Sequence, residues 1–171
     1  MFGPDVPQEQ LFGDVLTPLM ERFVNGQSCV LFAYGITNAG KTHTIQGTAK
    51  QPGILPRLVE SLLERTTKDS QGTDLQLGMY EIYQEKIFDL LNRRNKLALR
   101  DTGREVELPE LTYHKVTSAE STLKIVAKGS SKRSSGKTLL NIGSSRSHAV
   151  YTLMLRGEVF QIVDLAGAER K

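Results

Sequence analysis

Residues 35–42 combine glycines, a lysine and a hydroxyl side chain in the order G-I-T-N-A-G-K-T, which fits the phosphate-binding pattern G-x-x-x-x-G-K-[ST]. In such a loop, backbone N–H groups and the positive start of the next helix converge on phosphate oxygens. Lys41 would supply a mobile positive charge to the β and γ phosphates, and Thr42 a hydroxyl to Mg²⁺. A chance match is expected in roughly one chain per hundred of this length. The segment therefore predicts a nucleotide phosphate site.

Two later segments carry residue types that nucleotide hydrolysis needs, and each also has an ordinary explanation. The apolar run 159–163 ends at Asp164, a carboxylate able to hold Mg²⁺, and Gly167 follows with an N–H able to meet a γ phosphate. The ordinary explanation is a buried strand that ends at a surface aspartate. Residues 141–148 are rich in hydroxyls that can complete a Mg²⁺ shell and orient water, and Arg146 among them can pair with an acid. A solvated serine-rich loop is the alternative.

The elements that must position these residues alternate between strand and helix. The apolar run 29–34 predicts a buried strand that leads directly into the glycines. We expect helices from residue 7 to Gly26, kinked at Pro18, and over residues 41–45, 54–65 and 118–128, and strands over residues 75–83, 97–100, 106–108, 149–155 and 159–163. Residues 87–91 are predicted as a short helical turn, and the Ser- and Gly-rich residues 129–136 as a mobile loop. A hairpin across Gly157 makes the central sheet mixed, so the sequence predicts an α/β fold.

Composition narrows the class of protein. The chain has 171 residues, 39% hydrophobic and 24% charged, which suits one domain with a single core. A net charge of +3 is too small to imply nucleic acid, and no aromatic platform accompanies the basic residues. The single cysteine, Cys29, cannot form an internal disulfide, so a reducing compartment is the default. No apolar run approaches the roughly 20 residues of a membrane span, and the first residues do not resemble a signal peptide. We therefore expect a cytoplasmic or nuclear protein with no membrane insertion.

Four segments together resemble the kinesin motor domain, in the order found in that family. Residues 33–44 resemble its P-loop, and residues 81–91 its E-I-Y-N-E-x-I-x-D-L-L segment. Residues 141–148 and 164–170 are similar to switch I, N-x-x-S-S-R-S-H, and switch II, D-L-A-G-x-E-R. The P-loop and switch sequences typical of myosins are absent, and residues 95–98 lack the acid of the GTPase N-K-x-D motif. The resemblance implies a P-loop NTPase with a mixed sheet flanked by helices, residues 1–171 being a partial motor domain without the family's first strands and C-terminal part.

The resemblance also implies a role for individual residues. The implied nucleotide-binding residues are Gly35, Ile36, Thr37, Asn38, Ala39, Gly40, Lys41, Thr42, His43 and Gly167. Ser144 and Ser145 are implied to sense the γ phosphate and the attacking water, while Arg146 pairs with Glu169 to close the two switches. Thr42, Ser145 and Asp164 are the implied Mg²⁺ ligands. The family usually has serine where Ala168 stands.

The function implied by the resemblance is ATP hydrolysis coupled to microtubule binding and movement, with ATP and Mg²⁺ as cofactors, in a cytoplasmic protein of the cytoskeleton and the spindle. Lys86, Arg100 and Arg104 lie in the segment that faces tubulin in kinesins, and a second basic group extends from Lys124 to Lys137. For both groups the alternative is a solvated face. The competing function is a non-catalytic fragment that binds nucleotide or tubulin without turnover. Residues 36–38, 47–48 and 53–57 resemble those of the kinesin-6 group, although the long insertion typical of that group is absent here.

Expressed alone, residues 1–171 are expected not to be a working motor. The resemblance places the strand before the P-loop inside the family's sheet, beside a late strand that this chain lacks. That strand is therefore expected to present an open apolar edge, and such an edge promotes aggregation.

Overall fold

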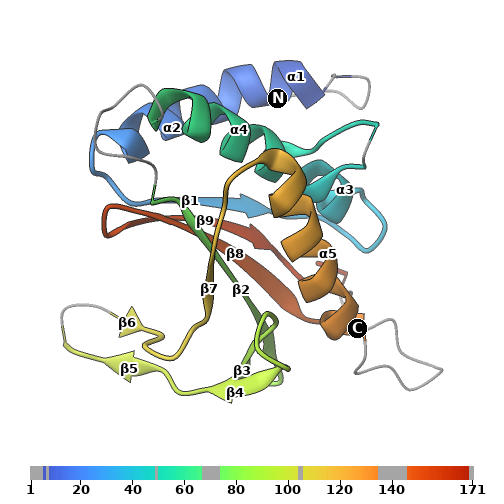
Figure 1. The fold of residues 1–171 in the computed structure, drawn as a ribbon. Coiled ribbons are helices and arrows are strands. Elements are labelled where there is room, and N and C mark those ends of the chain that lie inside the picture. Colours follow the sequence, from blue (N-terminus) through green and yellow to red (C-terminus); the bar gives the residue numbers. More distant parts are fainter. Residues whose placement is uncertain are drawn as a thin grey trace.

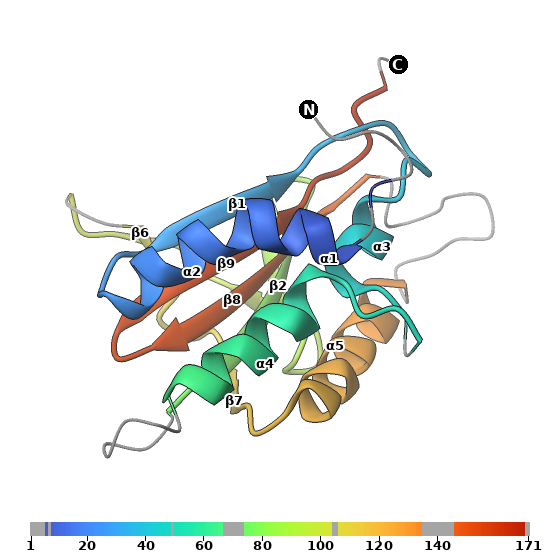
Figure 2. The ribbon, with the colours of Figure 1, turned by 90° about the horizontal axis from the view of Figure 1, so that it is seen from above.

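A seven-stranded mixed sheet forms the centre of the molecule, and helices cover one of its faces (Figures 1 and 2). A small two-stranded sheet lies at the end of the molecule away from the N-terminal helices (Figure 1). The computed structural model describes residues 6, 8–48, 50–66, 74–103, 106–134 and 146–169. The helical elements are α1 Gln8–Leu11, a π-helix over Phe12–Leu16, α2 Thr17–Val24, α3 Lys41–Gln46, α4 Ile54–Thr66 and α5 Ala119–Ser134. The central strands are β1 Cys29–Ala33, β2 Gln76–Tyr83, β3 Lys86–Asp89, β4 Asn95–Leu97, β7 Tyr113–Lys115, β8 His148–Leu155 and β9 Glu158–Asp164. The small sheet pairs β5 Arg100–Asp101 with β6 Val106–Glu107.

The sheet has the order β1-β9-β8-β2-β3-β4, and β7 pairs with β2. Only the β1–β9 pair is parallel among these pairings, and its register places Ala33 beside Asp164. Because parallel strands end at the same edge, the loop after β1 and the segment after β9 emerge side by side. The predicted α/β fold with a mixed sheet is therefore confirmed, and so is the β8–β9 hairpin. Its two-residue turn has Arg156 and Gly157 both at positive φ, +54° and +90°, as such a turn requires.

The main hydrophobic core lies between the helices and the sheet. One stripe of α4 is fully buried, with Leu55, Leu58 and Leu62 at the helical spacing predicted from the sequence. From α2, Phe23 meets Phe160 of β9 edge to face, with ring centroids 5.6 Å apart. An aromatic pair of this geometry adds about 0.5–1.5 kcal/mol beyond the burial of its area. The core therefore holds β9, which carries Asp164, firmly against the helical layer.

Pro18 breaks the first helix differently from the kink that we expected. The chain forms a π-helix over Phe12–Leu16, and α2 then starts at Thr17 with Pro18 in its first turn. Proline has no N–H to donate and its ring crowds the carbonyl of the preceding turn, so a wider turn before it removes both conflicts. Gly26 ends the helix as predicted, at φ +81° and with its N–H bonded to the carbonyl of Phe23.

The helical turn predicted over residues 87–91 is wrong, because residues 86–89 form strand β3. Gln84 and Glu85 both adopt positive φ, +49° and +59°, and fold β3 back onto β2 as a two-residue hairpin. In a run of only five residues, the spacing of the hydrophobic side chains cannot distinguish a helix from a strand. The strand predicted over 97–100 is only partly right, because β4 ends at Leu97 and β5 begins at Arg100, whereas β6 lies within the strand predicted over 106–108.

The loop predicted over residues 129–136 is also wrong for its described part, because α5 continues to Ser134. Its start is a reciprocal capping box in which the Ser121 N–H donates to Ser118 Oγ and the Ser118 N–H to Ser121 Oγ. Gly129 lies inside the helix where a Cβ atom would collide with the sulfur of Met79 on β2. The glycine therefore marks close packing of a helix on the sheet, not a loop. Residues 135 and 136 lie outside the described residues.

Strand β1 forms one edge of the described sheet, where it pairs only with β9. Its outward side chains Val30 and Phe32 are 46% and 61% exposed. This matches the open apolar edge expected from the sequence, within the part of the chain that the structure describes. Among the helices of that part, none has both the length and the apolar character of a membrane span.

Candidate nucleotide phosphate site

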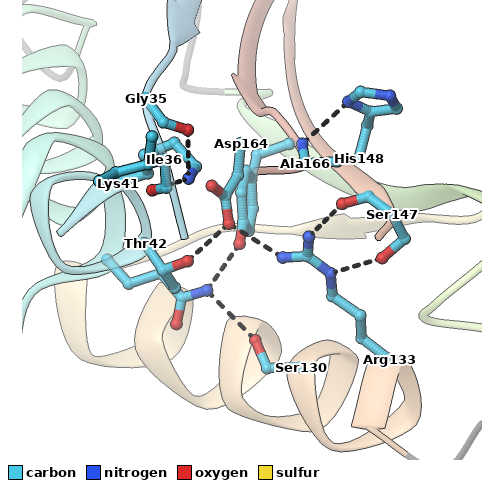
Figure 3. Close-up of polar contacts among 12 residues, drawn as sticks. Gly35, Ile36, Lys41, Thr42, Ser130, Arg133, Ser147, His148, Asp164 and Ala166 are labelled. Carbon is cyan, nitrogen blue, oxygen red and sulfur yellow. Dashed lines mark hydrogen bonds and ion pairs between the residues drawn. The ribbon is translucent and has the colours of Figure 1, made fainter. Parts of the chain in front are cut away.

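The glycine-rich loop follows β1 and leads directly into α3, as the pattern requires. Gly40 immediately precedes the helix at φ +87°, a conformation that glycine adopts without strain. Lys41 folds back over the loop, and its Nζ donates to the carbonyls of Gly35 at 2.9 Å and Ile36 at 2.8 Å (Figure 3). The ammonium group is thus held above the loop, next to the backbone that would surround a phosphate.

Thr42 and Asp164 come together next to this loop. The Thr42 hydroxyl donates to Asp164 Oδ2 at 2.7 Å, and the aspartate is buried (Figure 3). The parallel β1–β9 pairing causes this contact, because it brings the end of each strand to the same edge of the sheet. A hydroxyl and a carboxylate are the hard oxygen donors that Mg²⁺ prefers. The two side chains therefore fit the predicted metal site.

Arg133 of α5 is a member of this site that the sequence analysis missed. Its Nη1 lies 2.9 Å from Asp164 Oδ2, and its other nitrogens donate to Ser147 Oγ at 3.2 Å and the Ser147 carbonyl at 2.6 Å (Figure 3). In the sequence, Arg133 falls within the basic group from Lys124 to Lys137, for which a solvated face is the alternative, yet its side chain is only 6% exposed. Helical spacing was the available signal, since Thr122, Val126 and Arg133 share the buried face of α5.

A partly buried hydrogen-bonded cluster connects the end of α3 to α5 and β8. Gln46 Nε2 donates to the hydroxyl of Tyr151 at 2.6 Å and to Ser130 Oγ at 3.3 Å. Burial raises the pKa of Tyr151 to about 12, with Arg133 opposing the shift. The cluster lies behind the phosphate loop and fixes the helix that carries Lys41 and Thr42.

The segment after β9 passes alongside the loop and is bonded to it at several points. The N–H groups of Leu165 and Ala168 donate to the carbonyls of Ala33 and Gly35, at 3.2 and 3.1 Å. The Glu169 carboxylate accepts hydrogen bonds from the N–H of Thr37, at 2.9 Å, and from its hydroxyl. These bonds lower the pKa of Glu169 to about 2.

The structure therefore brings together several of the predicted residues, namely Gly35, Ile36, Thr37, Lys41, Thr42, Asp164 and Glu169. It does not join Arg146 to Glu169: Arg146 is exposed, and Glu169 is bonded to Thr37 instead. Ser144, Ser145 and Arg104 lie outside the described residues. Asn38, Ala39 and His43 are exposed around the loop, as is Lys86 at the start of β3. Arg100 pairs with Glu107 across the small sheet at 2.7 Å.

Comparisons with known proteins agree with this arrangement. A family model described as the kinesin motor domain matches residues 1–171. Kinesin-like protein KIF18B of Gallus gallus is 33% identical over 186 residues, which cover 99% of this chain and 23% of that protein. Kinesin-like protein 5 of Schizosaccharomyces pombe is 36% identical over 191 residues (99% and 22%), and kinesin-like protein KIP3 of Saccharomyces cerevisiae 32% over 189 residues (99% and 24%). The chain thus spans about a quarter or less of the length of these curated relatives.

Proposed function

This chain belongs to the kinesin motor domain family, and from that membership we propose that it forms the nucleotide-binding part of an ATP-driven microtubule motor. Motor domains of this family bind nucleotide, generally with Mg²⁺, and associate with microtubules. The observation that carries the proposal is the contact between Thr42 and Asp164 beside the glycine-rich loop. It joins the two sequence motifs that a nucleotide hydrolase needs, which lie far apart in the chain.

Thr42, Asp164 and Ser145 are the residues that we propose to hold Mg²⁺. When bound, the ion neutralises charge on the β and γ phosphates and so stabilises the charge that develops during phosphoryl transfer. The Thr42 oxygen would bind the ion through a lone pair, an arrangement in which its O–H can still donate to Asp164 Oδ2 as it does without the ion, and the carboxylate keeps Arg133 as a partner. The buried Asp164 therefore remains paired in both arrangements, which avoids the cost of an isolated buried charge.

Lys41 and Gly167 are proposed to contact the phosphates. Lys41 Nζ exchanges its two carbonyl partners, Gly35 and Ile36, for phosphate oxygens, a stronger charge-assisted interaction. The N–H of Gly167 bonds the γ phosphate. In this structure a Cβ atom at position 167 would meet the Thr37 hydroxyl and the Glu169 carboxylate, so the peptide at Gly167 lies directly against the loop.

Glu169 is proposed to change partner during the cycle. In this structure its carboxylate is bonded to Thr37. Closure of the switches around ATP would transfer it to Arg146, while Ser144 and Ser145 orient the attacking water. Such a change of partner is a two-state element of the kind by which a γ phosphate controls conformation.

The microtubule-binding surface is proposed to lie around strands β3–β6, at the end of the sheet away from α1 and α2 (Figure 1). Lys86 and Arg100 lie in this region, and Arg104 belongs to the same segment of the sequence. Positive side chains there suit the acidic face of tubulin. A microtubule-associated location, including the spindle, and membership of the kinesin-6 group are part of this proposal.

The proposal is tested with Lys41→Ala in the protein that carries this chain, measuring nucleotide affinity and phosphate release with and without microtubules. Exposed Lys50→Ala is the matched control. We expect Lys41→Ala to weaken nucleotide binding and the control to behave as wild type. Wild-type protein that binds nucleotide but releases no phosphate with microtubules would favour the non-catalytic alternative. Absence of nucleotide binding in the wild type would contradict the proposal.

A further inference from the structure

The four residues after Asp164 present their backbone N–H groups in different directions. Leu165 donates to Ala33 on β1, and Ala168 donates to Gly35 in the phosphate loop. Ala166 donates in the opposite direction, to Nδ1 of His148 on β8, at 3.1 Å (Figure 3). Among the described residues the N–H of Gly167 has no acceptor. Three bonds thus hold the segment while leaving one donor for another group.

The bond from Ala166 differs from its two neighbours because its acceptor is a side chain. The carbonyls of Ala33 and Gly35 exist whatever residues stand there, whereas only His148 supplies the acceptor on the β8 side. Since Nδ1 accepts, the ring proton lies on Nε2 when the imidazole is neutral. His148 is itself well fixed, because its backbone pairs with Ile82 of β2 and the preceding Ser147 is bound by Arg133.

We propose that His148 is a positioning residue for the proposed nucleotide reaction, and this inference rests on the proposed function. By binding the N–H of Ala166, it fixes the orientation of the next peptide unit, so that the Gly167 N–H stays available to the γ phosphate. Gly167 lies against the loop, since a Cβ atom there would meet the hydroxyl of Thr37. His148 therefore links strand β8 to the residue before Gly167. Among the described residues, the Gly167 N–H is the one donor of this segment without a protein acceptor. His148 does not touch the phosphate itself.

The chemistry of the bond allows a selective test. His148→Asn keeps an acceptor, because Oδ1 of asparagine lies close to where Nδ1 lies in histidine. His148→Leu removes every acceptor, and His148→Gln moves its carbonyl oxygen toward the position of Nε2. His148→Leu and His148→Gln both leave the position of Nδ1 without an acceptor, and they are called the non-accepting variants here. They differ in polarity and length, so a folding defect of one need not be shared by the other.

The first measurement is backbone amide exchange at Ala166 without nucleotide. We expect His148→Leu and His148→Gln to exchange at least about tenfold faster than wild type and His148→Asn to stay within about threefold of it. The second measurement is the affinity for a non-hydrolysable ATP analogue and for ADP. We expect an about fivefold loss for the ATP analogue in the two non-accepting variants, the size of one neutral hydrogen bond, and unchanged affinity for ADP.

An equal loss of affinity for both nucleotides, or equal behaviour of His148→Asn and His148→Leu, would overturn the positioning role. Unchanged exchange at Ala166 in both non-accepting variants would overturn the contact itself. If the wild type bound neither nucleotide, the proposed function would fail and the γ-phosphate role of His148 with it. Exchange at Ala166 would still report separately on the contact, so the two failures are distinguishable.

Discussion

Substitution of Arg133 by methionine removes the only positive partner of Asp164 among the described ion pairs. Both side chains are almost completely buried, at 6% and 3% exposure. Methionine has a length similar to the apolar part of arginine, so the change deletes charge and hydrogen bonds while it keeps most of the packing. The carboxylate then has the Thr42 hydroxyl as its partner but no positive charge to offset its burial.

Breaking a buried ion pair by removing one member typically costs about 3–5 kcal/mol, because an unpaired charge stays in a poorly solvated site. The free energy of unfolding of a domain is about 5–15 kcal/mol, so this loss is a large fraction of it. In a domain of this size 1 kcal/mol shifts the melting temperature by roughly 2–4 °C. We therefore expect Arg133→Met to lower the melting temperature by roughly 6–20 °C.

Thermal unfolding in the protein that carries this chain measures this effect. The matched control is Lys124→Met, on the same helix, which removes the pair of Lys124 with Glu120. That pair is 75% and 77% exposed and screened by solvent, so its loss should leave the melting temperature almost unchanged. The double variant Arg133→Met with Asp164→Leu removes both charges and should recover most of the loss. Equal melting temperatures for Arg133→Met and Lys124→Met would refute the assignment of a buried pair.

Tyr151→Phe is expected to flatten the alkaline loss of stability. The pKa of Tyr151 is raised above 10.0 to about 12, so its contribution is complete below pH 10 and is lost, by roughly 3 kcal/mol, as the pH rises to 12. Urea unfolding at several pH values measures this. Glu169→Ala should leave nucleotide binding largely intact and abolish microtubule-stimulated phosphate release; near-normal stimulation would contradict the proposed closing pair. Charge reversal at Arg100 and Arg104 should weaken cosedimentation with microtubules and flatten its salt dependence, with basal ATPase unchanged. Gly53→Ala should destabilise the fold by about 1–3 kcal/mol in urea unfolding, because a Cβ atom there lies 2.6 Å from the Gly47 nitrogen and the Ile45 carbonyl oxygen.

The features that the sequence determined by itself depend on residues close together in the chain. The glycine-rich loop lies between β1 and α3 as predicted, since an apolar run, glycines and a helix start follow one another directly. Asp164 ends β9 and the β8–β9 hairpin turns at Gly157, as predicted, because in both places an apolar run is followed directly by residues that end a strand. The α/β class also follows from the order of such local patterns.

Partners far apart in sequence were decided only by the tertiary structure. The parallel pairing of β1 with β9 brings Thr42 to Asp164 across 122 positions, and no local pattern states which strands become neighbours. The same pairing places Glu169 beside Thr37 instead of Arg146. From its residue type alone, Arg133 is expected on the surface. Its side chain reaches Asp164 only because α5 continues past Gly129. Whether a glycine ends a helix or lets it pack closely on a sheet depends on the surface opposite it, and that surface exists only once the chain has folded.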